Sequence, residues 1–281
     1  MPIMTSVYKL SAFSKDNRGG NPAGVYLQAD QLSKDEMQKI AFNVGFSETA
    51  FVSQSNIGDY RVRFFTPVDE VDLCGHATIA TFNLLRMLKV LEVGTYTQET
   101  NAGLLEVEVK KDAVFMTQNP PIFYQSIVKS EILDCFEGLG EHDIMSTPIQ
   151  VVSTGLKDII LPIRSLSALE DCRPNFKVIS ALSQRHDAVG IHAFCLESYR
   201  GGDAYVRNFA PLFGIDEEAA TGTSNGALAS YLNRYISPAK VNYRFEQGYG
   251  LGSPSEILVN LTLNEFGGVK VVSVGGSAYQ L

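Results

Sequence analysis

A cysteine, a glycine and a histidine stand side by side in DLCGHATIATFNLL, residues 72–85. If this stretch opens a helix, the helix N-terminus and the neighbouring His76 both lower the pKa of Cys74, and a thiolate can remove a proton from a substrate. Alternatively, Cys74 is a small buried apolar residue and His76 caps the helix turn. The residues alone leave both interpretations open.

Glu48, in GFSETAFV, is a second candidate, because it places a carboxylate at the entry of an otherwise apolar strand. Partial burial is expected to raise its pKa toward the range of a general acid/base. The alternative is a strand-end residue that is exposed to solvent or paired with an arginine such as Arg63.

Polar residues gather again in IDEEAATGTSNG, residues 215–226. Glu217 and Glu218 are either catalytic or merely favourable charges beside the dipole of the helix that follows. Thr223 and Ser224 either bind a ligand or are ordinary N-caps.

These two stretches occupy equivalent places in an apparent internal duplication. Phe65-Thr66-Pro67 precedes CGHA as Phe209-Ala210-Pro211 precedes TGTS, and "ETAFV" is echoed in "IHAFCL". The repeat predicts two equivalent helix N-termini, whose N–H groups could cage a carboxylate or an enolate. Gly75 and Gly222 either let a ligand approach or permit tight turns. In the second repeat, Thr221 stands at the position equivalent to Cys74. An epimerase mechanism that uses two thiols would therefore lack its second thiol.

The surrounding elements follow from periodicity and capping signals. Ser33 with Glu36 predicts a capping box and a helix to about Asn43. Residues 75–89 are apolar on nearly every side, which predicts a buried helix. Alternation predicts strands, with a turn over 18–24 and a stiff break at Asn119-Pro120-Pro121. The predicted strands are 8–13, 25–27, 49–52, 60–65, 104–109, 113–117 and 269–274.

Composition excludes several classes of protein. A net charge of −8 argues against nucleic-acid and membrane surfaces, and no signal peptide or membrane span is evident, so we expect a cytoplasmic protein. Four widely spaced cysteines and four histidines predict neither disulfides nor a metal site. Without a nucleotide-binding or other cofactor motif, no cofactor is expected.

Five ordered blocks then resemble the PhzF-like isomerase family of phenazine biosynthesis. They are GNPAGV, FSETAFV, FFTPVDEVDLCGHAT, EEAATGTSNGALA and GSPSEILV, and they span almost the entire chain. The resemblance implies an α+β fold of the diaminopimelate epimerase type. It has two similar domains, each a curved sheet or barrel around a central helix, with the active site in the cleft between them. The expected domains are residues 1–120, completed by 265–281, and residues 121–264.

The resemblance also implies the site residues. Glu48 matches the family's general acid/base, and His76 and Glu218 join it as catalytic residues. The expected substrate-binding residues are Asn21, Gly75, Ala77, Gly222 and Thr223. Glu218 stands where the family often has an aspartate, and Thr223 where it has a serine, which predicts a pocket for another substrate than the phenazine precursor. The family is commonly dimeric, so a homodimer is expected.

Three functions follow from these residues. The first is a cofactor-independent isomerase that moves a proton on a small carboxylate-bearing, anionic metabolite. The second is a racemase or epimerase in which Cys74 carries a proton. The third is a catalytically idle protein that binds a metabolite or a protein partner.

Overall fold

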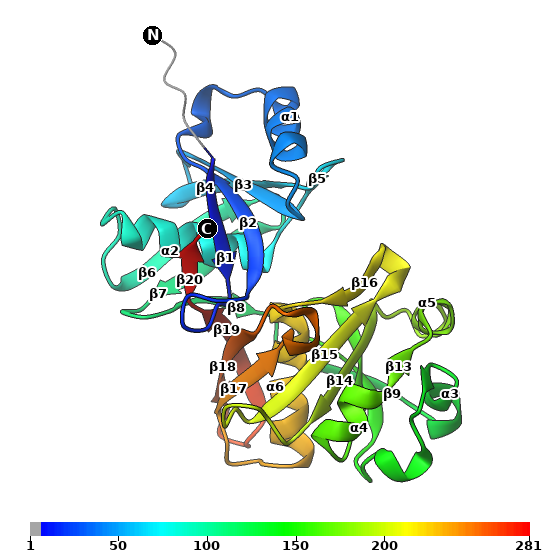
Figure 1. The fold of residues 1–281 in the computed structure, drawn as a ribbon. Helices are drawn as coiled ribbons and strands as arrows, with labels where there is room; N and C mark the ends of the chain where they lie inside the picture. Colours follow the sequence, from blue (N-terminus) through cyan, green and yellow to red (C-terminus); the bar gives the residue numbers. More distant parts are fainter. Residues whose placement is uncertain (1–6) are drawn as a thin grey trace. The chain divides into compact units, whose positions relative to one another are not determined.

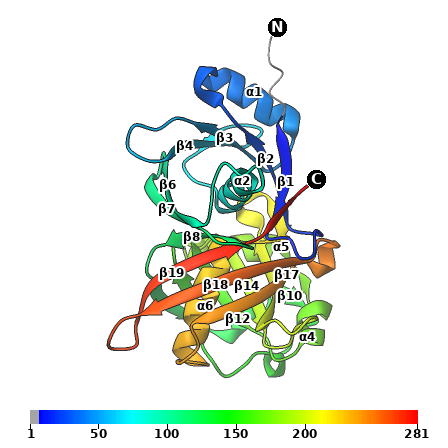
Figure 2. The same cartoon turned by 90° about the vertical axis from the view of Figure 1, so that its left-hand side faces the viewer.

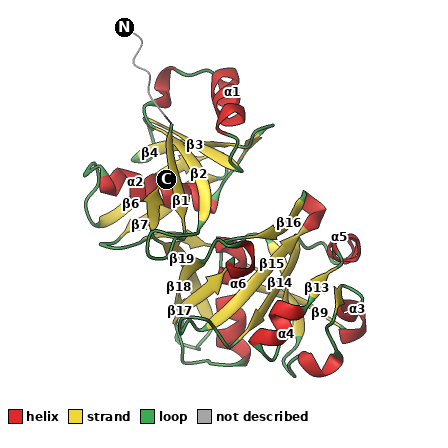
Figure 3. Cartoon of the chain, viewed as in Figure 1, coloured by secondary structure: helices red, strands yellow, loops and turns green. Residues whose placement is uncertain are grey.

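The computed structural model describes residues 7–281, which divide into two compact units (Figure 1). Unit 1 contains the chain up to Thr117 together with Gly275–Leu281, and unit 2 contains Gln118–Val274. Each unit is a mixed sheet curved around one long helix (Figure 3). The α+β fold of the diaminopimelate epimerase type, with two similar domains, is therefore confirmed.

Unit 1 surrounds α2 (Gly75–Met87) with strands, and Figure 2 views this helix nearly end-on. Its residues from Ala77 to Leu85 are all buried, as the apolar pattern predicts. The strands are β1 (Tyr8–Ala12), β2 (Asn21–Tyr26), β3 (Glu48–Ser53), β4 (Tyr60–Phe65), β5 (Glu70–Val71), β6 (Gly94–Thr100), β7 (Gly103–Val109), β8 (Val114–Gln118) and β20 (Ala278–Gln280). β20 pairs with β1, which ties the end of the chain to this unit.

The predicted capping box is present at α1 (Lys34–Val44). The Glu36 N–H donates to Ser33 Oγ at 3.3 Å, and the Ser33 N–H donates to Glu36 Oε2 at 2.8 Å. α1 ends at Gly45, whose φ of 72° suits glycine in the left-handed region. A short 3-10 turn, η1 (Ala29–Gln31), precedes it.

Unit 2 places α6 (Gly222–Tyr235) against β11, β12 and β18. Its strands are β9 (Ile122–Ile127), β10 (Phe136–Glu137), β11 (Ile149–Ser153), β12 (Lys157–Pro162), β13 (Arg173–Pro174), β14 (Gly190–Cys195), β15 (Ala204–Ala210), β16 (Ile215–Glu218), β17 (Asn242–Gln247), β18 (Ser255–Leu263) and β19 (Val269–Gly276). The other helices are α3 (Lys129–Leu133), α4 (Leu166–Asp171), α5 (Phe176–Arg185) and the 3-10 turns η2 (Glu141–Asp143), η3 (Pro211–Phe213) and η4 (Tyr249–Leu251).

The order of strand pairing repeats between the units. In unit 1, β2–β3 is parallel, β3–β4 and β4–β5 are antiparallel, and β4–β6 is parallel. In unit 2, β12–β14 is parallel, β14–β15 and β15–β16 are antiparallel, and β15–β17 is parallel. The long helix follows β5 in one unit and β16 in the other. The N-termini of α2 and α6 are thus topologically equivalent.

One local prediction is wrong. The turn expected over residues 18–24 is shorter, because β2 already begins at Asn21, where it pairs with Ala12 of β1. The positive φ angles of Asp16, Asn17, Gly19 and Gly20 confine the turn to the residues before β2. Asn21 is therefore a buried strand residue rather than part of a loop.

Candidate active site

Glu48 is the first residue of β3, which lies between β2 and β4. Its partner in the parallel pair with β2 is Ala23. The side chain of Glu48 is 21% exposed, so the carboxylate is partly shielded from water without being sealed from a ligand.

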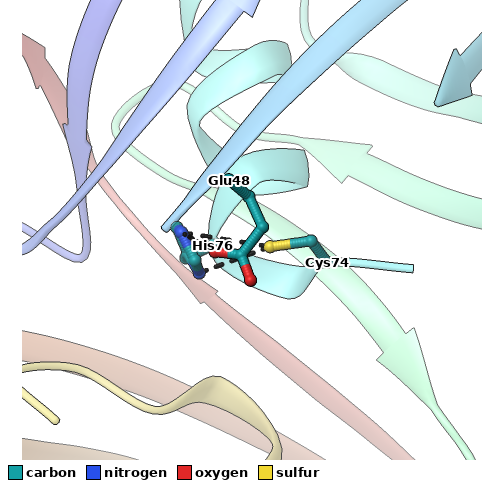
Figure 4. A group of neighbouring side chains, drawn as sticks. All are labelled: Glu48, Cys74 and His76. Atoms are coloured by element: carbon teal, nitrogen blue, oxygen red, sulfur yellow. Dashed lines mark hydrogen bonds and ion pairs between the residues drawn. The ribbon is translucent and has the colours of Figure 1, made fainter. Parts of the chain in front are cut away.

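Cys74 and His76 come from the start of α2, where Cys74 is the N-cap residue. His76 Nδ1 lies 3.4 Å from Cys74 Sγ, and His76 Nε2 lies 3.2 Å from Glu48 Oε2. Ser47 Oγ lies 3.3 Å from His76 Nε2. Figure 4 shows the side chains of Glu48, Cys74 and His76 turned toward one another. The fold thus brings the two catalytic candidates of unit 1 together.

The electrostatics of Glu48 differ from the sequence-based expectation of a raised pKa. Burial does raise the pKa of Glu48, but the contacts with His76, Ser47 and Cys74 outweigh it and hold the pKa below its usual value. The carboxylate is consequently ionised at neutral pH and can accept a proton. The sequence could not give this result, because His76 is far from Glu48 along the chain.

The two other members of the cluster also depart from their usual pKa values. Burial raises the pKa of Cys74, so the thiol is the stable form. Burial lowers the pKa of His76, but Cys74 and the carboxylate of Glu48 more than compensate, and the pKa lies well above its usual value. The pKa shifts of Glu48 and His76 have opposite signs, as expected when the two side chains form an ion pair.

Arg63 does not pair with Glu48, so that alternative is wrong. Arg63 instead forms two hydrogen bonds with Glu70, from Nε to Oε1 at 2.7 Å and from Nη2 to Oε2 at 2.8 Å. Glu217 has the corresponding place in unit 2, where its carboxylate accepts both Nε and Nη2 of Arg207, at 2.9 and 2.8 Å. Each pair braces the segment that leads into its central helix, which gives Glu217 a structural role.

At the start of α6, the N-cap residue is Thr221, and not Thr223 or Ser224 as the sequence allowed. Thr221 Oγ1 donates to Glu218 Oε2 at 2.8 Å, so Glu218 lies beside the helix end. Gln247 Oε1 accepts the Thr221 N–H at 3.1 Å, and Gln247 Nε2 donates to the Glu218 carbonyl at 2.8 Å. Gln247 thus fixes the shape of this end. Sequence analysis did not single it out.

Neither long central helix has a side-chain cap hydrogen bond at its N-terminus. In contrast, Ser33, Ser165 and Asn175 cap α1, α4 and α5 with their side chains. The first N–H groups of a helix need partners from outside it, and anions supply them well. Both central helix ends therefore retain the character of anion-binding sites.

Asp158 is a further buried acid that sequence analysis missed. It lies on β12 with 1% exposure and accepts a hydrogen bond from Ser224 Oγ at 2.8 Å. Burial is the main cause that raises its pKa to about 7, and the charge of Glu218 adds to it. The signal in the sequence is a lone aspartate directly before the apolar run of residues 159–161, since a buried aspartate is unusual.

The remaining predicted residues lie at the starts of α2, β2 and α6. Ala77 is fully buried in the first turn of α2, and Asn21 is buried at the start of β2. Glycine is not required by packing at Gly75, since an added Cβ would meet Met116 Cε at an ordinary 3.6 Å. Gly222 and Thr223 open α6, in unit 2. The structure places Glu48 and His76 in one unit and Glu218 in the other.

Known proteins share this architecture. The family described as phenazine biosynthesis-like protein (PhzC-PhzF) matches residues 10–281. An uncharacterized isomerase, YfhB of Bacillus subtilis, is 35% identical over 97% of this chain and 96% of its own. The PhzF-family protein of Bacillus anthracis has a crystal structure that superposes with a TM-score of 0.89 at 34% identity, covering 98% of this chain and 96% of that one.

A relative with a named reaction is the trans-2,3-dihydro-3-hydroxyanthranilate isomerase of Pseudomonas chlororaphis, 30% identical over 88% of this chain and 86% of its own. The chain therefore belongs to the phenazine biosynthesis-like (PhzC-PhzF) family, and it is an isomerase. Among the described residues, no helix is long and apolar enough to cross a membrane.

Proposed function

We propose that this protein is a cofactor-independent isomerase that shifts a proton on a small carboxylate-bearing metabolite, with Glu48 as the group that removes and returns the proton. The observation that carries the proposal is the pairing of an ionised, partly buried carboxylate with His76 at an uncapped helix N-terminus. A base, a proton-bearing neighbour and an anion-binding helix end are the parts that such a reaction needs.

In the proposed reaction, Glu48 is the only residue that carries the transferred proton. The carboxylate takes a proton from one carbon of the substrate, and the electron pair of the broken C–H bond spreads into the adjacent unsaturated system. The same carboxyl group then gives the proton to another carbon, so that the double bond has moved and no oxidant or reductant is needed. His76, which bears a proton, donates to a substrate oxygen as negative charge develops there.

The N-terminus of α2 supplies the second contribution. The N–H groups of its first turn and the positive end of its dipole favour a bound carboxylate. Gly75 leaves the backbone open at this point, since packing does not require a glycine there. We assign substrate binding to Gly75, Ala77 and Asn21 in unit 1.

Unit 2 contributes through the start of α6. Glu218 is held beside Thr221 by the hydrogen bonds of Gln247, in the place where the family often has an aspartate. We assign Glu218 to polarising the substrate, and Gly222 and Thr223 to binding it. The longer Glu218 and the extra methyl group of Thr223 support a substrate that differs from the phenazine precursor.

Cys74 is less suited to carry the proton than Glu48. Its pKa is raised by burial, whereas the Glu48 carboxylate is ionised. Thr221, the topological counterpart of Cys74, cannot serve as the second thiol of an epimerase with two thiols. The isomerase reaction needs one carrier and is supported by the group that is present.

The test is deuterium exchange in heavy water with a panel of small unsaturated and amino-substituted carboxylic acids. We expect the wild type to incorporate deuterium into at least one acid and Glu48→Gln to lose this exchange by about a hundredfold or more, the usual contribution of a general base. Glu108→Gln is the matched control, because Glu108 is an exposed strand carboxylate, 47% accessible. Exchange by Glu48→Gln at the wild-type rate would refute the proposal, and an acid that binds without exchange would favour the idle binding protein.

We also infer that the protein is a cytoplasmic homodimer. The homodimer is supported by the family, which is commonly dimeric. The cytoplasmic location is supported by the acidic composition. Sedimentation equilibrium of the purified chain tests the dimer, since a particle of monomer mass would contradict it.

A further inference from the structure

We propose that Glu48, Cys74 and His76 form a binding site for a borderline-soft divalent cation such as Zn²⁺, and that the occupied site is an inhibited state of the enzyme. The cation site stands on geometry alone, while the inhibition rests on the proposed function of Glu48. Sequence analysis predicted no metal site, because the cysteines and histidines lack the spacing of a zinc motif. The fold adds the third ligand, Glu48, which lies on β3 and is distant from Cys74 and His76 along the chain.

The separations of the three ligand atoms fit one small cation. Tetrahedral zinc with bonds of about 2.3 Å to sulfur and about 2.0 Å to nitrogen or oxygen places neighbouring ligand atoms about 3.3–3.6 Å apart. His76 Nε2 lies 3.2 Å from Glu48 Oε2 and 3.9 Å from Cys74 Sγ. One ligand atom from each of the three residues lies within 4.8 Å of the other two. The remaining separation, between Cys74 Sγ and a carboxylate oxygen of Glu48, is at most 4.8 Å, so a shift of at most about 1.2 Å brings the three atoms to tetrahedral spacing.

The second observation concerns an oxygen of Glu48. Oε2 is buried and lies 3.2 Å from His76 Nε2. Together with the orientation of the three side chains in Figure 4, this oxygen indicates a point on which the ligand atoms converge.

The chemistry of the ligands selects the cation. One thiolate, one imidazole and one carboxylate suit Zn²⁺ and Co²⁺, whereas Mg²⁺ and Ca²⁺ prefer sets of oxygen ligands. Cys74 binds such a cation as a thiolate and His76 as a neutral imidazole. The product, with Zn²⁺, one thiolate and one carboxylate, has no net charge, which suits a partly buried place beside a helix N-terminus. Three protein ligands leave a fourth position for water or a substrate carboxylate.

Occupation of the site would stop proton transfer. The lone pair of Glu48 that takes the substrate proton would be bonded to the cation, and so would the ring nitrogen of His76 that faces Glu48. A chelator would restore both groups. The cation is thus expected to act as a reversible inhibitor.

The binding test uses Co²⁺ as a spectroscopic probe of the full-length protein, after treatment with a chelator and without substrate. We expect one equivalent of Co²⁺ to give a thiolate-to-metal charge-transfer band in the near ultraviolet, and Zn²⁺ to abolish it. Cys74→Ser should lose the band and bind Zn²⁺ at least about tenfold more weakly, because even outer partners of metal ligands contribute that much. Cys195→Ser is the matched control, since Cys195 is also buried and free.

Two variants keep the test decisive. If Cys74→Ser fails to fold by circular dichroism, Glu48→Gln and His76→Asn should each weaken Zn²⁺ binding by a similar factor. Wild-type protein without the charge-transfer band, or Cys74→Ser with it, would overturn the site. The inhibition is measured separately, as the ratio of exchange rates with and without Zn²⁺ in the wild type and in Cys74→Ser, and an equal ratio in the two proteins would contradict it. Failure of the proposed isomerase would leave the cobalt spectrum unchanged, so the two failures are distinguishable.

Discussion

The carboxylate of Glu48 and the imidazole of His76 lie 3.2 Å apart, between Oε2 and Nε2, although one side chain comes from β3 and the other from the first turn of α2. In this pair each side chain favours the charged form of the other. The ion pair explains why a partly buried glutamate keeps a low pKa, and it makes the pH dependence of the enzyme a property of the pair.

The first prediction concerns this pair. His76→Asn removes the hydrogen bond and the charge of His76, the largest of the causes that lower the pKa of Glu48, and leaves the burial that raises it. Glu48 then needs a higher pH to lose its proton, so the acidic limb of kcat/KM for deuterium exchange should move to higher pH, and the maximal rate should fall at least about tenfold. The control is His142→Asn, because the side chain of His142 is 87% exposed. An unmoved acidic limb would contradict the assigned role of His76.

The second prediction separates substrate binding from folding at Gly75. Gly75→Ala should change the free energy of unfolding by less than about 1 kcal/mol, since its Cβ meets Met116 Cε at 3.6 Å. The same methyl group should raise KM for exchange by occupying the space of a bound carboxylate. Urea unfolding and exchange kinetics measure the two effects. An unchanged KM would show that the glycine does not serve the ligand.

Gly190→Ala is the contrasting variant for that experiment. A Cβ at Gly190 would lie 1.9 Å from the Phe209 carbonyl oxygen, so the sheet itself requires this glycine. We expect Gly190→Ala to unfold at much lower urea concentration than the wild type. A stable Gly190→Ala protein would contradict the register of β14 and β15.

The third prediction is an acid-dependent loss of stability through Glu70. Its side chain is 9% exposed, and the hydrogen bonds from Arg63 lower its pKa to about 2. Because the folded pKa lies below the unfolded one, the stabilisation is present above about pH 4.5 and is lost as the pH falls to about 2. Glu70→Gln should therefore cost about 1–3 kcal/mol at pH 6 and much less at pH 2.5. Denaturant titrations at both pH values measure this, with Glu108→Gln as control.

The fourth prediction has the opposite sign and concerns Asp158. Its pKa is raised to about 7 in the folded state, so its ionisation opposes folding as the pH rises from about 4 to 7. Asp158→Asn should accordingly stabilise the protein at pH 8 by about 1–3 kcal/mol and have little effect at pH 4. The exposed Asp187→Asn serves as control. Equal effects at the two pH values would mean that Asp158 is ionised throughout.

Local sequence determined much of the architecture. The capping box of Ser33 and Glu36, the apolar helix after Gly75 and the alternation of residues 60–65 each predict an element that the structure contains. These signals are local, because capping hydrogen bonds and the periods of helices and strands act over a few residues. The order of the blocks along the chain determined the family and, through it, the two similar domains.

Only the tertiary structure decided which side chains form ion pairs with one another. The sequence offered Arg63 as the partner of Glu48, but the antiparallel pairing of β4 with β5 gives Arg63 to Glu70, and β3 delivers Glu48 to His76. Ion pairs, burial and pKa shifts depend on distances between segments remote in sequence. For that reason the low pKa of Glu48, the clamp of Gln247 on α6 and the convergence of a thiol, an imidazole and a carboxylate became visible only in the folded chain.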